Sequence, residues 1–125
     1  MKLRIYRDNI RLRLTPGDVH QLMAARSLTE TTHFPGSTLT YACRLMPTVS
    51  QPTVTFDANQ ITVDLPLAAA QRWAESQDVT LTASQQIDGG RTLQILIEKD
   101  FECLLPGKDE PGIELYPNPR KTQTV

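Results

Sequence analysis

Three arginines and a tyrosine near the start of the chain fall on alternate positions of two short segments whose intervening positions are apolar. They are Arg4, Tyr6, Arg11 and Arg13. A period of two is typical of β-strands, so we predict two strands that carry these side chains on one face. A two-residue turn at Asp8-Asn9 would place Arg4 opposite Arg13, and such a like-charge pair costs stability unless an anion lies nearby. Guanidinium groups match phosphate and carboxylate geometry, so the first hypothesis is a site for a small anionic ligand.

The alternative is that this basic face is neutralised from within the chain. Positions 51 residues later hold Thr55, Asp57, Thr62 and Asp64, so a second hairpin is acidic where the first is basic. Glu98 and Asp100 share one face of a further predicted strand and could also reach the arginines. We therefore predict that these two carboxylates belong to the ligand site or serve as its counter-ions. A pair of carboxylates for acid–base chemistry is the less common use of such a pattern.

His33 and Cys103 are the residues that could support an enzyme. A cysteine and a histidine can act as nucleophile and base, and with a nearby carboxylate they could bind zinc. The close ligand pairs typical of zinc sites are absent, and so are the GxGxxG, Walker, HExxH and GxSxG motifs. We assign no catalytic residue, metal site or cofactor, and we keep His33 and Cys103 as the alternative. The two cysteines, Cys43 and Cys103, are expected to be free thiols.

The elements that position these residues occur twice along the chain. A shift of 51 residues aligns Leu3–Thr31 with Val54–Thr82 without a gap and matches Leu28 with Val79; a shift of 54 then aligns Thr38–Tyr41 with Thr92–Ile95. Each copy, 2–46 and 53–103, reads as two strands, a helix and two strands. The helices are expected after Thr15-Pro16 and at Pro66, because proline fits the first helical position.

The predicted fold is α+β and mostly β. A tandem ββαββ repeat would form one barrel-like or two-sheet domain over residues 1–105, with two short helices. Their buried faces are expected to be Val19, Leu22 and Met23, and Ala70, Trp73 and Ala74. Residues 106–125 are expected to form a Pro-rich, extended C-terminal tail that packs on the body through Ile113, Leu115 and Tyr116.

Two resemblances extend this interpretation. The stretch Ile61–Ala74 (ITVDLPLAAAQRWA) resembles the strand–Pro–helix segment of AbrB-like transition-state regulators. That resemblance implies a swapped-hairpin topology, which in those regulators joins two chains into a DNA-binding dimer. The whole chain is also similar to a family of short bacterial proteins with no assigned function, through the stretches IRLRLT, ETTHF, EKDFEC and YPNP. This second similarity implies kinship and supplies no activity.

The bulk composition narrows the class of partner. Thirteen basic and fourteen acidic residues give a net charge of -1, which disfavours nonspecific nucleic-acid binding. Because no apolar run reaches about 20 residues and no signal peptide is evident, we expect a cytoplasmic protein without a membrane partner. The leading hypothesis is a non-enzymatic binding or regulatory module for an unknown protein or small anionic ligand. The alternatives are a small enzyme or metal-binding protein using His33, Cys103 and nearby carboxylates, and a nucleic-acid binder using the first hairpin.

Overall fold

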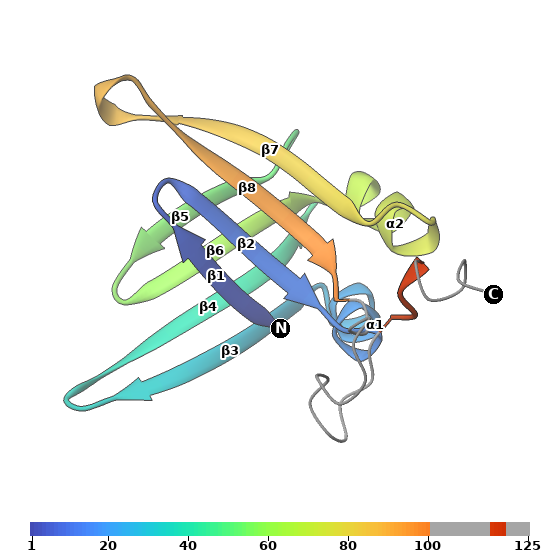
Figure 1. Ribbon diagram of the computed structural model, residues 1–125, viewed down its shortest axis with the longest axis horizontal. Coiled ribbons are helices and arrows are strands. Elements are labelled where there is room, and N and C mark those ends of the chain that lie inside the picture. Colours follow the sequence, from blue (N-terminus) through green and yellow to red (C-terminus); the bar gives the residue numbers. More distant parts are fainter. Residues whose placement is uncertain (101–115, 120–125) are drawn as a thin grey trace.

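Each half of the chain forms two hairpins joined by a short helix, as a computed structural model describes for residues 1–100 and 116–119 (Figure 1). The first half contains β1 (Lys2–Tyr6), β2 (Asn9–Leu14), α1 (Pro16–Ala25), β3 (Ser27–Phe34) and β4 (Ser37–Met46). The second contains β5 (Thr53–Asp57), β6 (Gln60–Pro66), α2 (Leu67–Glu75), β7 (Thr80–Ile87), the 3-10 turn η1 (Asp88–Gly90) and β8 (Arg91–Lys99). The predicted α+β class is confirmed.

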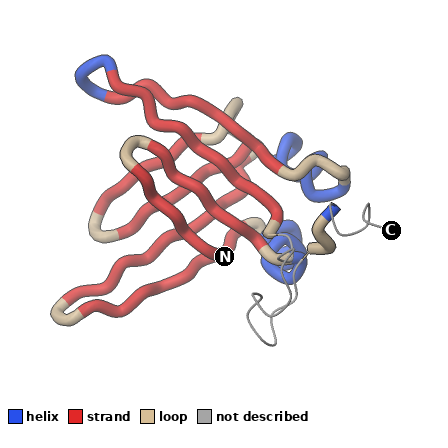
Figure 2. The backbone as a smooth tube through the Cα atoms, in the orientation of Figure 1, coloured by secondary structure: helices blue, strands red, loops and turns tan. Residues whose placement is uncertain are grey.

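The two halves exchange hairpins to build two four-stranded sheets (Figure 2). Sheet A has the order β1-β2-β8-β7, and sheet B has the order β3-β4-β6-β5. The hairpins meet through parallel pairs, β2 with β8 and β4 with β6. Each sheet therefore contains one hairpin from each half, and neither half forms a sheet alone.

The two-sheet form of the prediction is confirmed, and a closed barrel is wrong. Neighbouring edges of the sheets are bridged by side chains instead of a β-ladder. The Gln85 side chain on β7 accepts from the Val54 N–H at 2.7 Å and donates to the Val54 carbonyl at 3.2 Å. At the other edge, the Tyr41 hydroxyl donates to the Met1 carbonyl at 3.1 Å. These contacts satisfy edge groups that would otherwise be left for water.

Both helices lie at one end of the sheets, and the four hairpin turns lie at the other (Figure 1). Thr15 caps α1 in a capping box: its hydroxyl accepts from the Asp18 N–H, and the Asp18 carboxylate accepts from the Thr15 N–H. Pro66 precedes α2 without a side-chain cap. Val19 and Leu22 of α1, and Ala70 and Trp73 of α2, are buried as their spacing predicts.

The core fills the space between the inner faces of the sheets and the two helices. Its buried strand residues are the alternate apolar positions Ile10, Leu12, Leu14, Leu28, Cys43, Leu45, Ile61, Val63, Leu65, Ile95 and Ile97. Tyr116 packs against this cluster from the C-terminal segment. Alternation leaves the other strand positions on the outer faces, such as the even-numbered residues of β1 and the odd-numbered residues of β2, and charge is tolerated there.

The predicted pairing of the first hairpin is wrong by two residues. The turn is at Arg7-Asp8, so Arg4 lies opposite Arg11, and Tyr6 lies opposite Asn9. Arg7 takes the left-handed conformation with a φ of 53°. The second hairpin turns at the equivalent place, Ala58-Asn59.

The predicted match of Leu28 with Val79 is also wrong. Leu28 pairs with Cys43, and Leu81 pairs with Ile97, so Leu81 occupies the place of Leu28 in the second half. The extra residues lie between α2 and β7. The Val79 carbonyl in this segment accepts from Trp73 Nε1 and from the Lys99 N–H, both at 3.0 Å.

Candidate functional site

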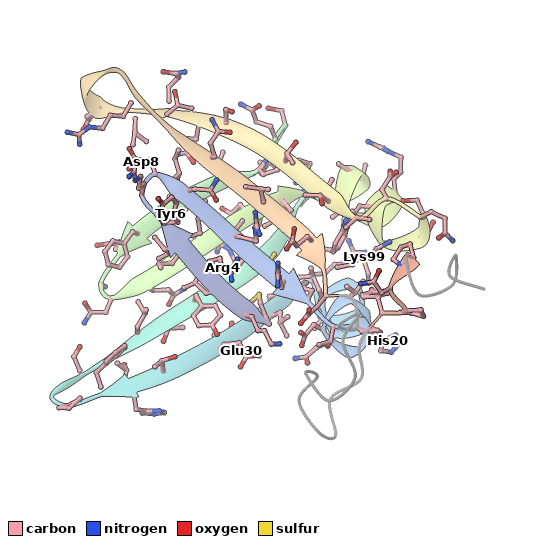
Figure 3. All side chains as sticks on the ribbon, viewed as in Figure 1. Arg4, Tyr6, Asp8, His20, Glu30 and Lys99 are labelled. Atoms are coloured by element: carbon pink, nitrogen blue, oxygen red, sulfur yellow. The ribbon has the colours of Figure 1, made fainter. Side chains whose placement is uncertain are left out.

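Arg4, Tyr6, Arg11 and Arg13 share the outer face of sheet A, together with Lys2 and Asn9. We call these six residues the basic face. Figure 3 labels Arg4 and Tyr6 on β1. In the hairpin register, Lys2 lies opposite Arg13, Arg4 opposite Arg11, and Tyr6 opposite Asn9. The basic face therefore has three rows. Two rows each contain two basic residues, and the row nearest the turn contains a phenol and an amide.

Glu98 neutralises the row nearest the helices. It lies on β8 beside Arg13, whose Nε donates to the Glu98 carboxylate at 2.5 Å. The same carboxylate oxygen is 3.8 Å from Arg11 Nε, which is too long for a hydrogen bond. Among the described residues Arg11 Nε has no hydrogen-bond partner although it is buried. Glu98 therefore forms a close, hydrogen-bonded ion pair with Arg13 and only a distant one with Arg11.

Asp100 lies just beyond β8, at the helix end of the sheet. Its N–H donates to the Leu14 carbonyl, and its carbonyl accepts from the Tyr116 N–H, both at 2.9 Å. Its carboxylate is 3.3 Å from Lys2 Nζ. Asp100 therefore lies next to Lys2 and Tyr116, away from Arg4 and Arg11.

The acidic second hairpin does not reach the basic face, so this part of the internal-neutralisation alternative is wrong. Asp57 and Asp64 lie on sheet B. Asp64 accepts from Arg44 Nε at 2.8 Å and from a second Arg44 nitrogen at 3.0 Å. Within the described part of the chain, Arg4 has no ion pair and no hydrogen bond through its side chain. Among residues 1–100 and 116–119, Arg4 is therefore the arginine of the predicted site that has no counter-ion.

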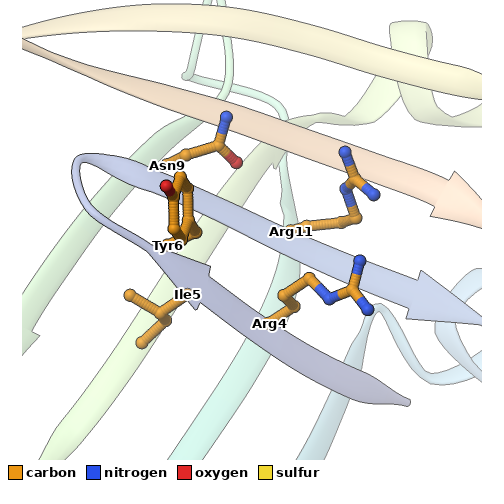
Figure 4. Close-up of a pocket in the computed structure, with 5 residues that line it drawn as sticks. All are labelled: Arg4, Ile5, Tyr6, Asn9 and Arg11. Atoms are coloured by element: carbon orange, nitrogen blue, oxygen red, sulfur yellow. The ribbon is translucent and has the colours of Figure 1, made fainter.

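A surface cavity of about 350 Å³ opens at this unneutralised end of the basic face (Figure 4). It is lined by Arg4, Ile5, Tyr6, Asn9 and Arg11. Three of these residues were predicted as site residues, and Asn9 was missed because the sequence placed it in the turn. The turn at Ala58-Asn59 in the second copy was the signal that would have moved Asn9 onto the strand.

Of the two residues kept for the enzyme alternative, only His33 lies within the described residues; the described cysteine is Cys43. Cys43 is a free, fully buried thiol, and burial followed by the charge of Asp64 raises its pKa to about 12, which keeps it protonated. His33 is exposed near the β3–β4 turn of sheet B, whereas Glu98 lies on sheet A. Cys103 lies outside the described residues. In the ranges 1–100 and 116–119, no group of three His, Cys, Asp or Glu side chains is arranged to hold a metal ion.

The chain is thus a two-sheet α+β protein with exchanged hairpins and one partly unneutralised basic face. It belongs to DUF7009, a family of unknown function whose model matches residues 1–120. No curated protein and no solved structure matches it. Across the described residues, no helix has both the length and the apolar composition needed to cross a membrane.

Proposed function

We propose that this protein is a non-enzymatic binding module that takes a small anionic ligand between Arg4 and Arg11. The observation that carries the proposal is a comparison of equivalent positions. Arg4 faces Arg11 on sheet A, and Thr55 faces Thr62 at the same register on sheet B. Because sheet B forms with threonines there, the fold does not require a pair of like charges at this place.

The chemistry of the pair favours an anion. Directly opposed strand residues have Cα atoms only about 5 Å apart, and like charges at that separation destabilise a hairpin. An anion between the two guanidinium groups would offset this repulsion and accept several hydrogen bonds. The buried Nε of Arg11 has no hydrogen-bond partner within residues 1–100 and 116–119, so Glu98 leaves this guanidinium group incompletely satisfied.

Equilibrium titration with inorganic phosphate in a low-salt chloride buffer tests the proposal. We expect phosphate to bind, and we expect Arg4→Gln and Arg11→Gln each to weaken binding by about tenfold, because each removes a charged hydrogen-bond donor. The matched control is Arg44→Gln, which makes the same change in net charge on sheet B, where Arg44 is paired with Asp64.

Two results would overturn the proposal. One is the absence of phosphate binding to the native protein. The other is an equal loss of binding in Arg44→Gln, because the attraction would then be due to net charge alone. Retention of fold in each variant is checked by its thermal unfolding midpoint.

We also propose that the two halves arose by duplication and share the swapped-hairpin topology of AbrB-like domains. The exchange of hairpins between the sheets supports this, as does the identical register of β1 with β2 and of β5 with β6. A bacterial cytoplasmic location stays a prediction. So do the enzyme alternative through His33 and Cys103 and the nucleic-acid alternative through the first hairpin.

A further inference from the structure

Tyr6 is an exposed aromatic ring beside Arg4 and Arg11. Its side chain is 66% exposed, and it lies on the same strand face as Arg4. The Arg7 guanidinium lies 5.3 Å from the ring centroid, so a cation–π contact holds one cation at the ring. The equivalent position on sheet B is Asp57, so the fold does not need an aromatic residue here. An exposed ring of this kind is suited to stacking on a planar group of a ligand.

The cavity arranges two kinds of binding group in adjacent rows (Figure 4). The first row holds the guanidinium groups of Arg4 and Arg11, and the second holds the Tyr6 ring and the Asn9 amide. Alternate residues of a strand are about 7 Å apart, so an anion site and a stacking site are separated by that span. A nucleotide carries a phosphate and a flat base separated by a sugar of comparable length.

We propose, resting on the anion site proposed above, that the ligand is a nucleoside 5′-phosphate. Its phosphate would lie between Arg4 and Arg11, its base on the Tyr6 ring, and a polar edge of base or sugar against the Asn9 amide. A cavity of about 350 Å³ is within the range of small-molecule sites.

The surroundings favour a mononucleotide over a nucleic-acid strand. The next row toward the helices, Lys2 and Arg13, is already paired with Asp100 and Glu98. A second phosphate would therefore have to displace an existing ion pair. A single ring and a net charge of -1 also lack the repeated rings and the excess positive charge of a strand-binding groove.

The test compares the affinities of the full chain for inorganic phosphate, ribose 5-phosphate and AMP under identical low-salt conditions. We expect AMP to bind about tenfold more tightly than ribose 5-phosphate, because only AMP has a base to stack. Tyr6→Leu should reduce the affinity for AMP to that for ribose 5-phosphate. Tyr6→Phe, which keeps the ring and loses only the hydroxyl, should retain most of the advantage.

Each outcome has one meaning. If phosphate and ribose 5-phosphate bind but AMP gains nothing, the nucleotide assignment is wrong and the anion site stands. If none of the three binds, both proposals fail together. If a single-stranded oligonucleotide binds far more tightly than AMP and Tyr6→Leu weakens it, the ligand is a nucleic acid, and the mononucleotide assignment is overturned.

Discussion

The outer faces of the two sheets have the same strand register and different chemistry. In the row nearest the helices, sheet A pairs Arg13 with Glu98, and sheet B pairs Asp64 with Arg44 at the equivalent positions, with the charges reversed. The fold thus accepts either sign at each position, provided that the pair is neutral. In the next row this balance holds only on sheet B.

The two outer faces differ in the cross-strand pair of this next row. Thr55 and Thr62 form a neutral cross-strand pair with good strand propensity, whereas Arg4 and Arg11 repel each other. Since both hairpins fold in the same register, the repulsion is tolerated and not required. A cost that the fold does not require is most simply explained by a ligand that offsets it.

The largest effect should come from breaking what the two halves share. Leu22 and Trp73 occupy equivalent places on α1 and α2, and both are almost fully buried. We expect Trp73→Ala to lower the free energy of unfolding by about 4 kcal/mol and Leu22→Ala by about 3 kcal/mol, because each leaves a cavity. Trp73 also loses its hydrogen bond to the Val79 carbonyl. Denaturant unfolding measures both values, and a loss below about 1 kcal/mol at either site would contradict a common core.

Removing the acid from each equivalent ion pair should have unequal effects. Glu98→Gln leaves Arg13 and Arg11 without a counter-ion beside Arg4, so we expect a loss of about 1.5 kcal/mol. Asp64→Asn leaves only Arg44, whose side chain is 47% exposed, so we expect about 0.5 kcal/mol. Chemical denaturation at low and high salt measures both. Equal losses would mean that the basic face is no more crowded with charge than sheet B.

The capping box at the start of α1, which has no counterpart at α2, should contribute a smaller and pH-dependent part of the stability. Burial raises the pKa of Asp18, but the Met1 ammonium group and hydrogen bonds with Thr15 outweigh it and hold that pKa below its ordinary 3.8. The stabilisation is therefore complete above the ordinary value and is lost as the pH falls through the lowered folded-state pKa. We expect Asp18→Asn to cost about 1 kcal/mol at pH 7 through loss of the capping box.

The cost of Asp18→Asn should shrink as the pH falls through the lowered folded-state pKa of Asp18, because the native carboxylate then also becomes protonated. Unfolding curves across this range measure the difference between native protein and variant. Glu75→Gln, at an exposed position near the end of α2, is the matched control because it removes a carboxylate outside the capping box. A pH-independent difference for Asp18→Asn would contradict the lowered pKa.

Local pattern alone predicted most of the fold. Alternating apolar residues defined the strands, and Thr15-Pro16 and Pro66 located the starts of the helices to within a residue. The exchange of hairpins could not be derived from periodicity, because period two does not specify which strands become neighbours. The errors lay in register: Arg7 is not a residue that typically takes positive φ, so the turn was placed at Asp8-Asn9.

The site was predicted in its residues more than in its geometry. The strand alternation correctly grouped Arg4, Tyr6, Arg11 and Arg13 on one face. Which carboxylates reach them depends on the β2–β8 pairing between residues 85 positions apart, which no local pattern determines. The sequence therefore included Asp100, which lies at the helix end, and omitted Asn9, which lines the cavity.

The smallest expected effect on stability comes from making the row of Arg4 and Arg11 on sheet A more like the equivalent row of sheet B. Arg4→Thr restores at this row a residue found at the equivalent place on sheet B, and it relieves the repulsion with Arg11. In a low-salt buffer without phosphate, we expect the variant to be more stable than the native protein by about 0.5 kcal/mol. Saturating phosphate should reverse the order, because a ligand that binds only the native fold adds stability in proportion to its occupancy.

Only a ligand site predicts that reversal. High sodium chloride screens the repulsion and should bring the two unfolding midpoints together without crossing them. Crossing in phosphate, with mere convergence in chloride at equal ionic strength, separates specific binding from screening. If Arg4→Thr remains the more stable protein at every phosphate concentration, the two arginines do not bind phosphate, and the difference between the two outer faces needs another cause.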